Sequence, residues 1–293
     1  MKLMQTMRRL LTVIPIVVVP AAATAQTAVR FGNESADTTA ITNMLVEGAA
    51  ARLTSPEEYV AFFGNKFAGT PYGAHTLEGD TEILTVRLDS IDCTTFVETA
   101  LALAYTVGEN RTSWRDFIYN LQRLRYRGGT VDGYASRLHY IADWAVDNIH
   151  RGNLTDATRL FPKVNYIVRT IDFMSANADR YPALTDSATL ARIRSIEEGY
   201  RSHRFPYLKT SDLGSRAMTD ALSNGDVVAF VSNLNNLDVT HMGIIVKESP
   251  TAVPHVMHAS SSQGKVVVES RPLVDFLRKN RYWLGIRVFR LAR

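Results

Sequence analysis

The segment that decides the fold reads Asp92-Cys93-Thr94-Thr95-Phe96-Val97-Glu98-Thr99-Ala100-Leu101-Ala102-Leu103-Ala104. Asp92 is a favoured helix N-cap, and the apolar residues after it recur on nearly every side of a helix. We therefore expect a largely buried helix with Cys93 in its first turn. A strand rich in β-branched residues is predicted just before it, at about 82–88.

Further helices are predicted on both sides of this segment. Ser55-Pro56-Glu57-Glu58 combines an N-cap, a proline at the first helical position and a glutamate three residues after the cap, which is typical of a helix start. The apolar pattern places helices at about 41–53, 55–70, 113–124 and 141–149.

The C-terminal third predicts strands instead. Asn224-Gly225 is a turn signal. β-Branched runs follow it at about 226–231, 240–246, 256–259, 265–269 and 286–291. Helices first and an antiparallel sheet afterwards indicate an α+β fold in which the N-terminal helices pack on the sheet.

Residues 1–25 read as a secretory signal peptide. Three basic residues precede an apolar run at 10–19, and Ala23-Thr24-Ala25 is an A-x-A cleavage motif. We therefore expect an exported protein, located in the periplasm. No later segment approaches the ~20 apolar residues of a spanning helix, so we expect no stable membrane insertion after cleavage.

The charge of the chain excludes one class of partner. Its 33 basic residues exceed the 29 acidic ones, but three of the basic residues lie in the signal peptide. The remaining chain is nearly neutral and lacks the basic stripe of a nucleic-acid-binding protein. We expect residues 26–293 to form a single monomeric domain with a helical elaboration at about 110–210.

The single cysteine is the most informative count. Exported proteins normally use cysteines in pairs, as disulfides, and this chain has only Cys93. A lone thiol is incidental, intermolecular or reactive. At a helix start, unpaired N–H groups and the helix dipole favour an anion, so we expect a lowered thiol pKa and a nucleophilic Cys93.

A thiol nucleophile needs a base, and two histidines suit the role. His241 opens a predicted strand in Thr240-His241-Met242-Gly243, and His258 lies on the next strand. Neighbouring strands lie about 4.8 Å apart, so His258 can hydrogen-bond the far nitrogen of His241 and fix its tautomer. Gly243 allows a close approach of the backbone.

Zinc binding is the competing chemistry, because one cysteine and several histidines can ligate that metal. The sequence has no His-x-x-x-His or Cys-x-x-Cys pair, and the carboxylates near the histidines are not at ligand spacing. We therefore expect neither a metal nor a cofactor.

The order of these residues resembles the NlpC-type papain-like cysteine hydrolases. The narrower resemblance is to their N-acetylmuramoyl-L-alanine amidase-like branch and spans about residues 55–290. Four blocks carry it: Gly69-Thr70-Pro71-Tyr72, Asp92-Cys93-Thr94-Thr95-Phe96-Val97-Glu98, Ser136-Arg137-Leu138-His139-Tyr140 with Asp143-Trp144, and Thr240-His241-Met242-Gly243. Thr94-Thr95 replaces the Ser-Gly pair of the wider family, which argues against transferring the endopeptidase specificity common there.

This resemblance implies a circularly permuted papain-like fold and a Cys93, His241, His258 triad. It also implies hydrolysis of the amide between N-acetylmuramic acid and L-alanine in muropeptides, with a preference for 1,6-anhydro forms. Tyr72 would help to form the oxyanion site. We place Asp92 and Thr240, which flank the nucleophile and the base, among the substrate-binding residues.

The block around Arg137 has two interpretations. It is either an ordinary amphipathic helix start with a solvated arginine, or a specificity wall. In the second, Arg137 and His139 contact sugar or carboxylate groups, and Trp144 stacks on a sugar face.

Two other functions stay open at this point. One is an endopeptidase that cuts γ-D-glutamyl-diamino acid bonds in the stem peptide of peptidoglycan. The other is a non-catalytic wall-binding protein in which Cys93 is incidental.

Overall fold

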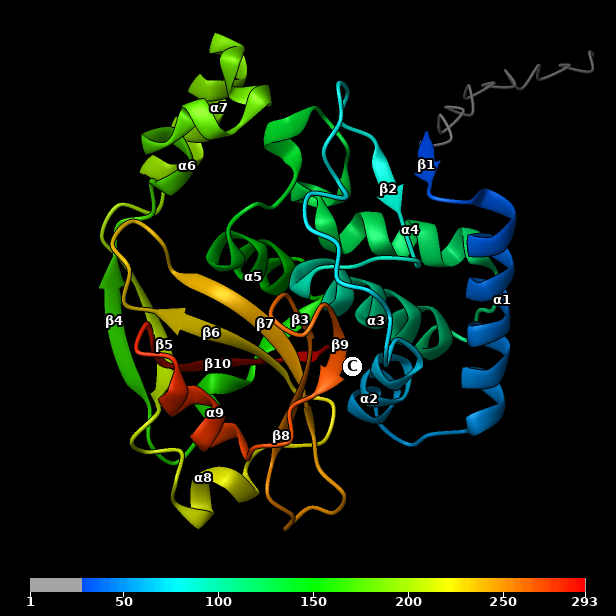
Figure 1. The fold of residues 1–293 in the computed structure, drawn as a ribbon, viewed down its shortest axis with the longest axis vertical. Helices are drawn as coiled ribbons and strands as arrows, with labels where there is room; N and C mark the ends of the chain where they lie inside the picture. Colours follow the sequence, from blue (N-terminus) through cyan, green and yellow to red (C-terminus); the bar gives the residue numbers. More distant parts are fainter. Residues whose placement is uncertain (1–27, 293) are drawn as a thin grey trace, which may run out of the picture.

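The computed structural model describes residues 28–292, so the predicted signal peptide lies outside the described residues. The chain forms a mixed α+β fold in which helices cover an antiparallel sheet (Figure 1). Its longer N-terminal helices are α1 (Glu34–Ala51), α2 (Pro56–Lys66), α3 (Cys93–Gly108), α4 (Trp114–Arg125) and α5 (Ile141–His150). The later helices are α6 (Phe173–Ala176), α7 (Ser187–Glu198), α8 (Arg216–Asp220) and α9 (Leu273–Lys279).

The main sheet has eight strands in the order β4-β5-β10-β6-β7-β8-β9, with β3 also paired to β10. Every pairing in it is antiparallel. The strands are β3 (Leu154–Asp156), β4 (Asn165–Arg169), β5 (His203–Lys209), β6 (Val227–Ser232), β7 (Val239–Val246), β8 (His255–Ser260), β9 (Lys265–Val268) and β10 (Trp283–Leu291). A separate parallel pair joins β1 (Val29–Phe31) to β2 (Leu84–Val86).

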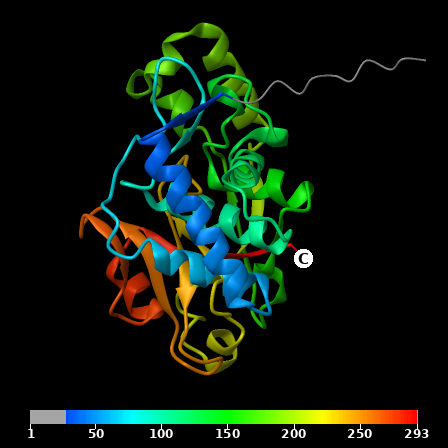
Figure 2. The same ribbon diagram turned by 90° about the vertical axis from the view of Figure 1, so that its right-hand side faces the viewer.

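Both faces of the sheet are covered, because its central strands alternate between two cores. Val227 and Ala229 of β6 join the core formed with α1 to α5. Val228 and Phe230 point the other way and pack with Leu273 and other residues of the α8 and α9 side. Figures 1 and 2 show α1 to α3 on one side of the sheet and α9 on the other. The start of β7 and the end of β8 therefore lie between two packed layers.

Local sequence explains why the helices start where they do. Ser55 caps α2 with the predicted capping box, since Glu58 N donates to Ser55 Oγ and Glu58 accepts from the Ser55 N–H. The first helix begins at Glu34 rather than near residue 41, because Asn33 caps it by accepting from Ala36 N. Helix α2 ends at Lys66 and not near residue 70.

The segment from about 110 to 210, expected as a helical elaboration, also contains strands. β3, β4 and β5 lie within it and extend the main sheet. The same segment contains short 3-10 helices at Arg127–Gly129, Tyr134–Ser136, Ala157–Leu160, Ala178–Arg180 and Pro182–Thr185. Helices α6 and α7 share a small hydrophobic cluster with the start of α5 and the segment before it.

Candidate active site

Cys93 is the first residue of α3, as predicted. Asp92 caps the helix: its Oδ1 accepts from Thr94 N at 3.1 Å and from Thr95 N at 2.8 Å. Thr95 Oγ1 accepts in return from Asp92 N at 2.9 Å. The second threonine of the Thr-Thr pair thus completes the cap. The cap leaves the backbone N–H of Cys93 unused.

The expected lowering of the Cys93 pKa is wrong. The thiol is half-buried at the base of the α3 N-terminus, and burial, together with the neighbouring Asp92 carboxylate, raises its pKa to about 11. The helix start does favour an anion, but desolvation and the adjacent negative charge outweigh it. Cys93 therefore rests as a thiol at neutral pH.

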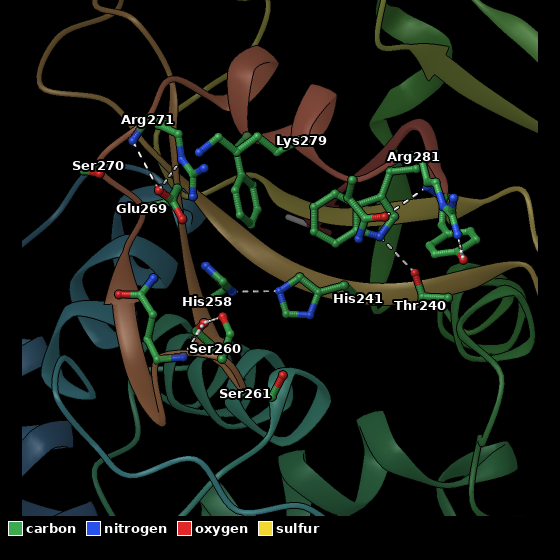
Figure 3. A pocket seen from close by; sticks show the side chains of 16 residues that line it. Thr240, His241, His258, Ser260, Ser261, Glu269, Ser270, Arg271, Lys279 and Arg281 are labelled. Carbon is green, nitrogen blue, oxygen red and sulfur yellow. Dashed lines mark hydrogen bonds and ion pairs between the residues drawn. The ribbon is translucent and has the colours of Figure 1, made fainter.

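The hydrogen bond predicted between the two histidines is present. His241 Nε2 lies 2.8 Å from His258 Nδ1, with the rings edge to face (Figure 3). β7 and β8 pair only as far as Ile244 and Met257, so the strands are no longer paired where the two imidazoles meet. The bond leaves His241 Nδ1 as the ring nitrogen available to a substrate or a thiol.

Both imidazoles rest neutral. Burial lowers the pKa of His241 to about 3, with a smaller contribution from His258. Burial also lowers the pKa of His258 to about 4. A neutral thiol beside a neutral imidazole is a general-base arrangement and not a preformed thiolate–imidazolium pair.

The main chain of β7 brings Cys93 to the histidines. The backbone N–H of Met242, the residue after His241, points at the sulfur and opposes the rise in its pKa. Within residues 28–292 the sulfur forms no hydrogen bond with either imidazole. Catalytic hydrogen bonds are often long in unliganded enzymes and shorten with substrate bound.

Gly243 permits this arrangement by its lack of a side chain. A Cβ at this position would lie 2.8 Å from the Met257 carbonyl oxygen and 3.3 Å from the His258 Cβ. Any larger residue would push β8, and His258 with it, away from β7. The close approach predicted for this glycine is therefore confirmed.

Tyr72 lies near Cys93 and Asp92, and Thr240 lies next to His241 in β7. Tyr72 is held to the loop before β9 by its backbone N–H, which donates to Gly264 O at 2.8 Å. Burial and the nearby Cys93 and Asp92 raise the pKa of Tyr72, so its hydroxyl stays protonated and able to donate. Thr240 is exposed, and its Oγ1 accepts from Trp283 Nε1 at 3.0 Å.

The specificity wall predicted around Arg137 is not built as expected. Trp144 is fully buried and packs edge to face on Phe289, so it cannot stack on a sugar. Arg137 is neither solvated nor open to a ligand. It is buried and pairs with Glu78 at 2.7 Å and with Glu82 at 3.6 Å.

His139 is likewise engaged within the protein. Its Nε2 lies 2.8 Å from the Tyr134 carbonyl oxygen, and its ring packs on the Tyr134 ring at 4.4 Å. Burial and the nearby Arg137 lower its pKa to about 3. The helix-start pattern gave no means of distinguishing these internal contacts from ligand contacts.

A hollow of about 970 Å³ opens beside the two histidines. Its floor is aromatic, since Trp283 stacks parallel to the His241 ring at 5.9 Å and Phe276 lies 5.1 Å from the His258 ring. Three cations, Arg271, Lys279 and Arg281, line the hollow together with the buried carboxylate of Glu269 (Figure 3). The remaining polar lining consists of four serines together with Thr240, Gln263, Asn280 and Tyr282.

Sequence reasoning missed these lining residues, because they come from α9 and from the loops on either side of it. No motif marks them, and α9 itself is only seven residues long. The one available signal was the dense run of charged and aromatic residues at 269–283.

Two further observations concern metal binding and membrane-spanning helices. No group of three or more His, Cys, Asp or Glu side chains in residues 28–292 is arranged to hold a metal ion. None of the helices in the same range is long and apolar enough to cross a membrane.

Comparison with known proteins places the chain in a family. A family model described as AmiA-like, N-acetylmuramoyl-L-alanine amidase-like, matches residues 62–286. A crystal structure of an N-acetylmuramoyl-L-alanine amidase from Bacteroides uniformis ATCC 8492 is 37% identical, with a TM-score of 0.74, and the match covers 81% of this chain and 99% of that one. A search of curated proteins gave no match.

Two other solved structures are similar. One, titled a putative xylanase from Bacteroides fragilis, is 38% identical over 78% of this chain and 99% of that one, with a TM-score of 0.71. A protein from Legionella pneumophila, 22% identical over 89% of this chain and 97% of that one, has a TM-score of 0.67 and shares the fold. From the family match and the amidase structure together, the chain belongs to the N-acetylmuramoyl-L-alanine amidase-like family.

Proposed function

We propose that this protein is an exported cysteine amidase that cuts the amide between N-acetylmuramic acid and L-alanine in muropeptides. The observation that carries the proposal is the 2.8 Å bond between His241 and His258, beside a thiol that the next residue, Met242, contacts through its backbone. In this proposal Cys93 is the nucleophile, His241 the base and His258 the orienting group.

The reaction begins from neutral groups. His241 Nδ1 takes the proton of Cys93 as the sulfur attacks the lactyl carbonyl carbon, so the thiolate forms only during attack. His258 accepts from the Nε2–H of His241 and stabilises the imidazolium that develops. Because His258 is buried and His241 is partly buried, this stabilisation acts in a medium of lower dielectric than water.

The oxyanion of the tetrahedral intermediate needs hydrogen-bond donors. The backbone N–H of Cys93, which the helix cap leaves free, is one, and the protonated Tyr72 hydroxyl is the other. The amide nitrogen of L-alanine leaves with the proton from His241. A water molecule, activated by the same nitrogen, then hydrolyses the thioester.

The hollow beside the histidines suits the peptide half of the substrate. The stem peptide of a muropeptide carries several carboxylates, and Lys279 and Arg281 offer it cations on the rim. We place the sugar on the Tyr72 side of Cys93. A preference for small 1,6-anhydro-muropeptides follows from the family resemblance.

The proposal also covers the fold, the cellular location and the oligomeric state. We propose a circularly permuted papain-like arrangement, in which the cysteine helix precedes the strands that carry the histidines. We also propose secretion to the periplasm after cleavage near residue 25, and action as a monomer.

Product analysis tests the bond that is cut. Wild-type protein is incubated with a defined anhydro-muropeptide and its reducing counterpart, and the products are weighed by mass spectrometry. The proposal expects an intact sugar and a peptide that begins with a free L-alanine. Fragments cut after D-glutamate would instead establish the γ-D-glutamyl-diamino acid endopeptidase, and an uncut substrate would support a wall-binding protein.

A further inference from the structure

One nitrogen next to the proposed active site is unexplained by the mechanism. His258 Nδ1 faces His241, but His258 Nε2 is buried and has no hydrogen-bond partner. A buried polar group without a partner costs about 1–3 kcal/mol relative to a satisfied one. Such an atom beside a proton-transfer chain therefore calls for an acceptor or a donor nearby.

Glu269 lies near enough to His258 for its charge to favour the protonated imidazole, although its carboxylate makes no hydrogen bond to Nε2 in this structure. Its backbone N–H donates to Val256 O at 2.8 Å, which continues the β8–β9 register just past Met257 and Val268. Its carbonyl oxygen lies 2.9 Å from His255 Nδ1. Glu269 is thus directly opposite Val256, on the same face of the sheet as His258 and diagonal to it.

The side chain of Glu269 is buried as well, and its surroundings keep it anionic. Arg271 Nε donates to Glu269 Oε1 at 2.9 Å, and this bond lowers the Glu269 pKa. Figure 3 shows His258 between His241 on one side and Glu269 with Arg271 on the other.

Among the residues that line the hollow, Glu269 is the single anionic neighbour of His258. His241 faces it from β7, Arg271 from the loop after β9, and Lys279 and Arg281 line the same hollow from α9 and the following loop. Glu269 is the one acidic side chain in that lining and the one group that favours a proton on His258 against the effect of burial.

We infer that Glu269 is a positioning residue, whose carboxylate keeps the single proton of neutral His258 on Nε2 and thereby leaves Nδ1 as an acceptor for His241. With Nδ1 accepting, His241 must carry its own proton on Nε2. Its Nδ1 then has a free lone pair, which is the base that Cys93 requires. Arg271 thus keeps Glu269 anionic, Glu269 sets the tautomer of His258, and His258 sets the tautomer of His241.

The opposite arrangement would disable the base. If His258 carried its proton on Nδ1, it would donate to His241 Nε2, and His241 would hold its proton on Nδ1, the side meant to accept. A wrong tautomer of this kind leaves the geometry intact while removing general-base catalysis. Glu269 thus acts through two imidazoles, without touching substrate.

The test uses nitrogen-15 NMR of histidine-labelled full-length protein together with kinetics. In wild-type protein at pH 7, His258 should carry its proton on Nε2 and His241 on Nε2. Glu269→Leu should move part of the His258 population to Nδ1–H and lower kcat at least about tenfold, with KM within about twofold. Glu269→Gln keeps a carbonyl acceptor and should restore part of both.

Asp275→Leu is the matched control, because it removes one carboxylate from the exposed side of α9, where Asp275 pairs with Arg278. It should leave the tautomers and kcat unchanged. The inference is overturned by a wild-type His258 protonated on Nδ1, or by a folded Glu269→Leu protein with wild-type tautomers and kcat. The wild-type spectrum decides the matter even if Glu269→Leu does not fold.

This inference rests on the proposed function for its kinetic consequence alone. The tautomers are measured without substrate, so the result does not depend on which bond the enzyme cuts. Wild-type protein that leaves muropeptides intact, but shows the expected tautomers, would sink the proposed amidase and keep the role of Glu269.

Discussion

Two regions of this molecule carry motifs that the sequence linked to function, the histidine pair as catalytic residues and the Arg137 block as either a specificity wall or an ordinary helix start, and they differ in the structure. The His241–His258 pair lies on strands that are no longer paired where the rings meet, beside a hollow. The Arg137 region is closed: Arg137 is buried and pairs with the exposed Glu78 and the buried Glu82 carboxylates, and Trp144 is a core residue. Both contain buried polar side chains. They differ in whether a side-chain nitrogen remains free to bind a substrate.

The comparison teaches that buried charge by itself does not indicate a site. Arg137 has its charge neutralised by Glu78 and Glu82, and Glu82 in turn accepts from the Tyr126 hydroxyl at 2.7 Å. This network ties the loop after Tyr72 to the helical layer. In the histidine pair, by contrast, the internal bond uses one nitrogen of His241 and leaves the other free.

The largest expected effect concerns the base. His241→Ala should lower kcat by about a hundredfold to ten-thousandfold, because general-base catalysis contributes that much, while thermal stability changes little. His150→Ala, at the exposed end of α5, is the control and should keep full activity. Steady-state kinetics on a muropeptide measures both. Near wild-type turnover in His241→Ala would remove the distinction between the two regions.

Arg137→Ala should have its main effect on stability. Removing one partner of a buried pair costs about 3–5 kcal/mol, because the buried Glu82 carboxylate would lose its ion-pair partner. Urea denaturation measures the free energy of unfolding. Arg192→Ala breaks an exposed pair with Asp132 and should cost less than about 1 kcal/mol.

The same Arg137 experiment can contradict the account. If the folded Arg137→Ala protein kept its stability but its KM rose strongly, Arg137 would be a substrate ligand after all, and the closed description of that region would be wrong.

A smaller effect concerns the thiol. With its pKa raised to about 11, Cys93 should react with iodoacetamide more slowly at pH 7 than a free cysteine, by roughly a hundredfold. The rate should rise about tenfold per pH unit as pH approaches 11, because each unit increases the thiolate fraction tenfold. A fast, pH-independent reaction between pH 6 and 8 would indicate a preformed ion pair instead.

Local patterns predicted the parts of the fold that local interactions build. The capping box of α2, the Asp92 cap of α3 and the Asn224-Gly225 turn depend on residues within a few positions of one another, and all are present. β5 escaped prediction, since Pro206 interrupts its pattern and its pairing partners β4 and β10 are far apart in sequence.

The features of the site also divide into those that the sequence predicts and those that depend on tertiary packing. The approach of His241 and His258 could be predicted, because adjacent strands bring their residues together. The pKa of Cys93 could not, since it depends on how deeply tertiary packing buries the sulfur. Glu269 carries no motif, and its relation to His258 appears only through the β8–β9 register.

The central claim is that Cys93 forms a covalent bond to the muramoyl half of the substrate. Wild-type protein mixed with a muropeptide is quenched in acid during the first turnover and analysed by intact and peptide mass spectrometry. The account predicts a transient adduct of the muramoyl sugar on the peptide that contains Cys93, and neither adduct nor cleavage with Cys93→Ala, which should melt near the wild-type temperature. Cleavage by a folded Cys93→Ala protein at the wild-type rate would contradict it.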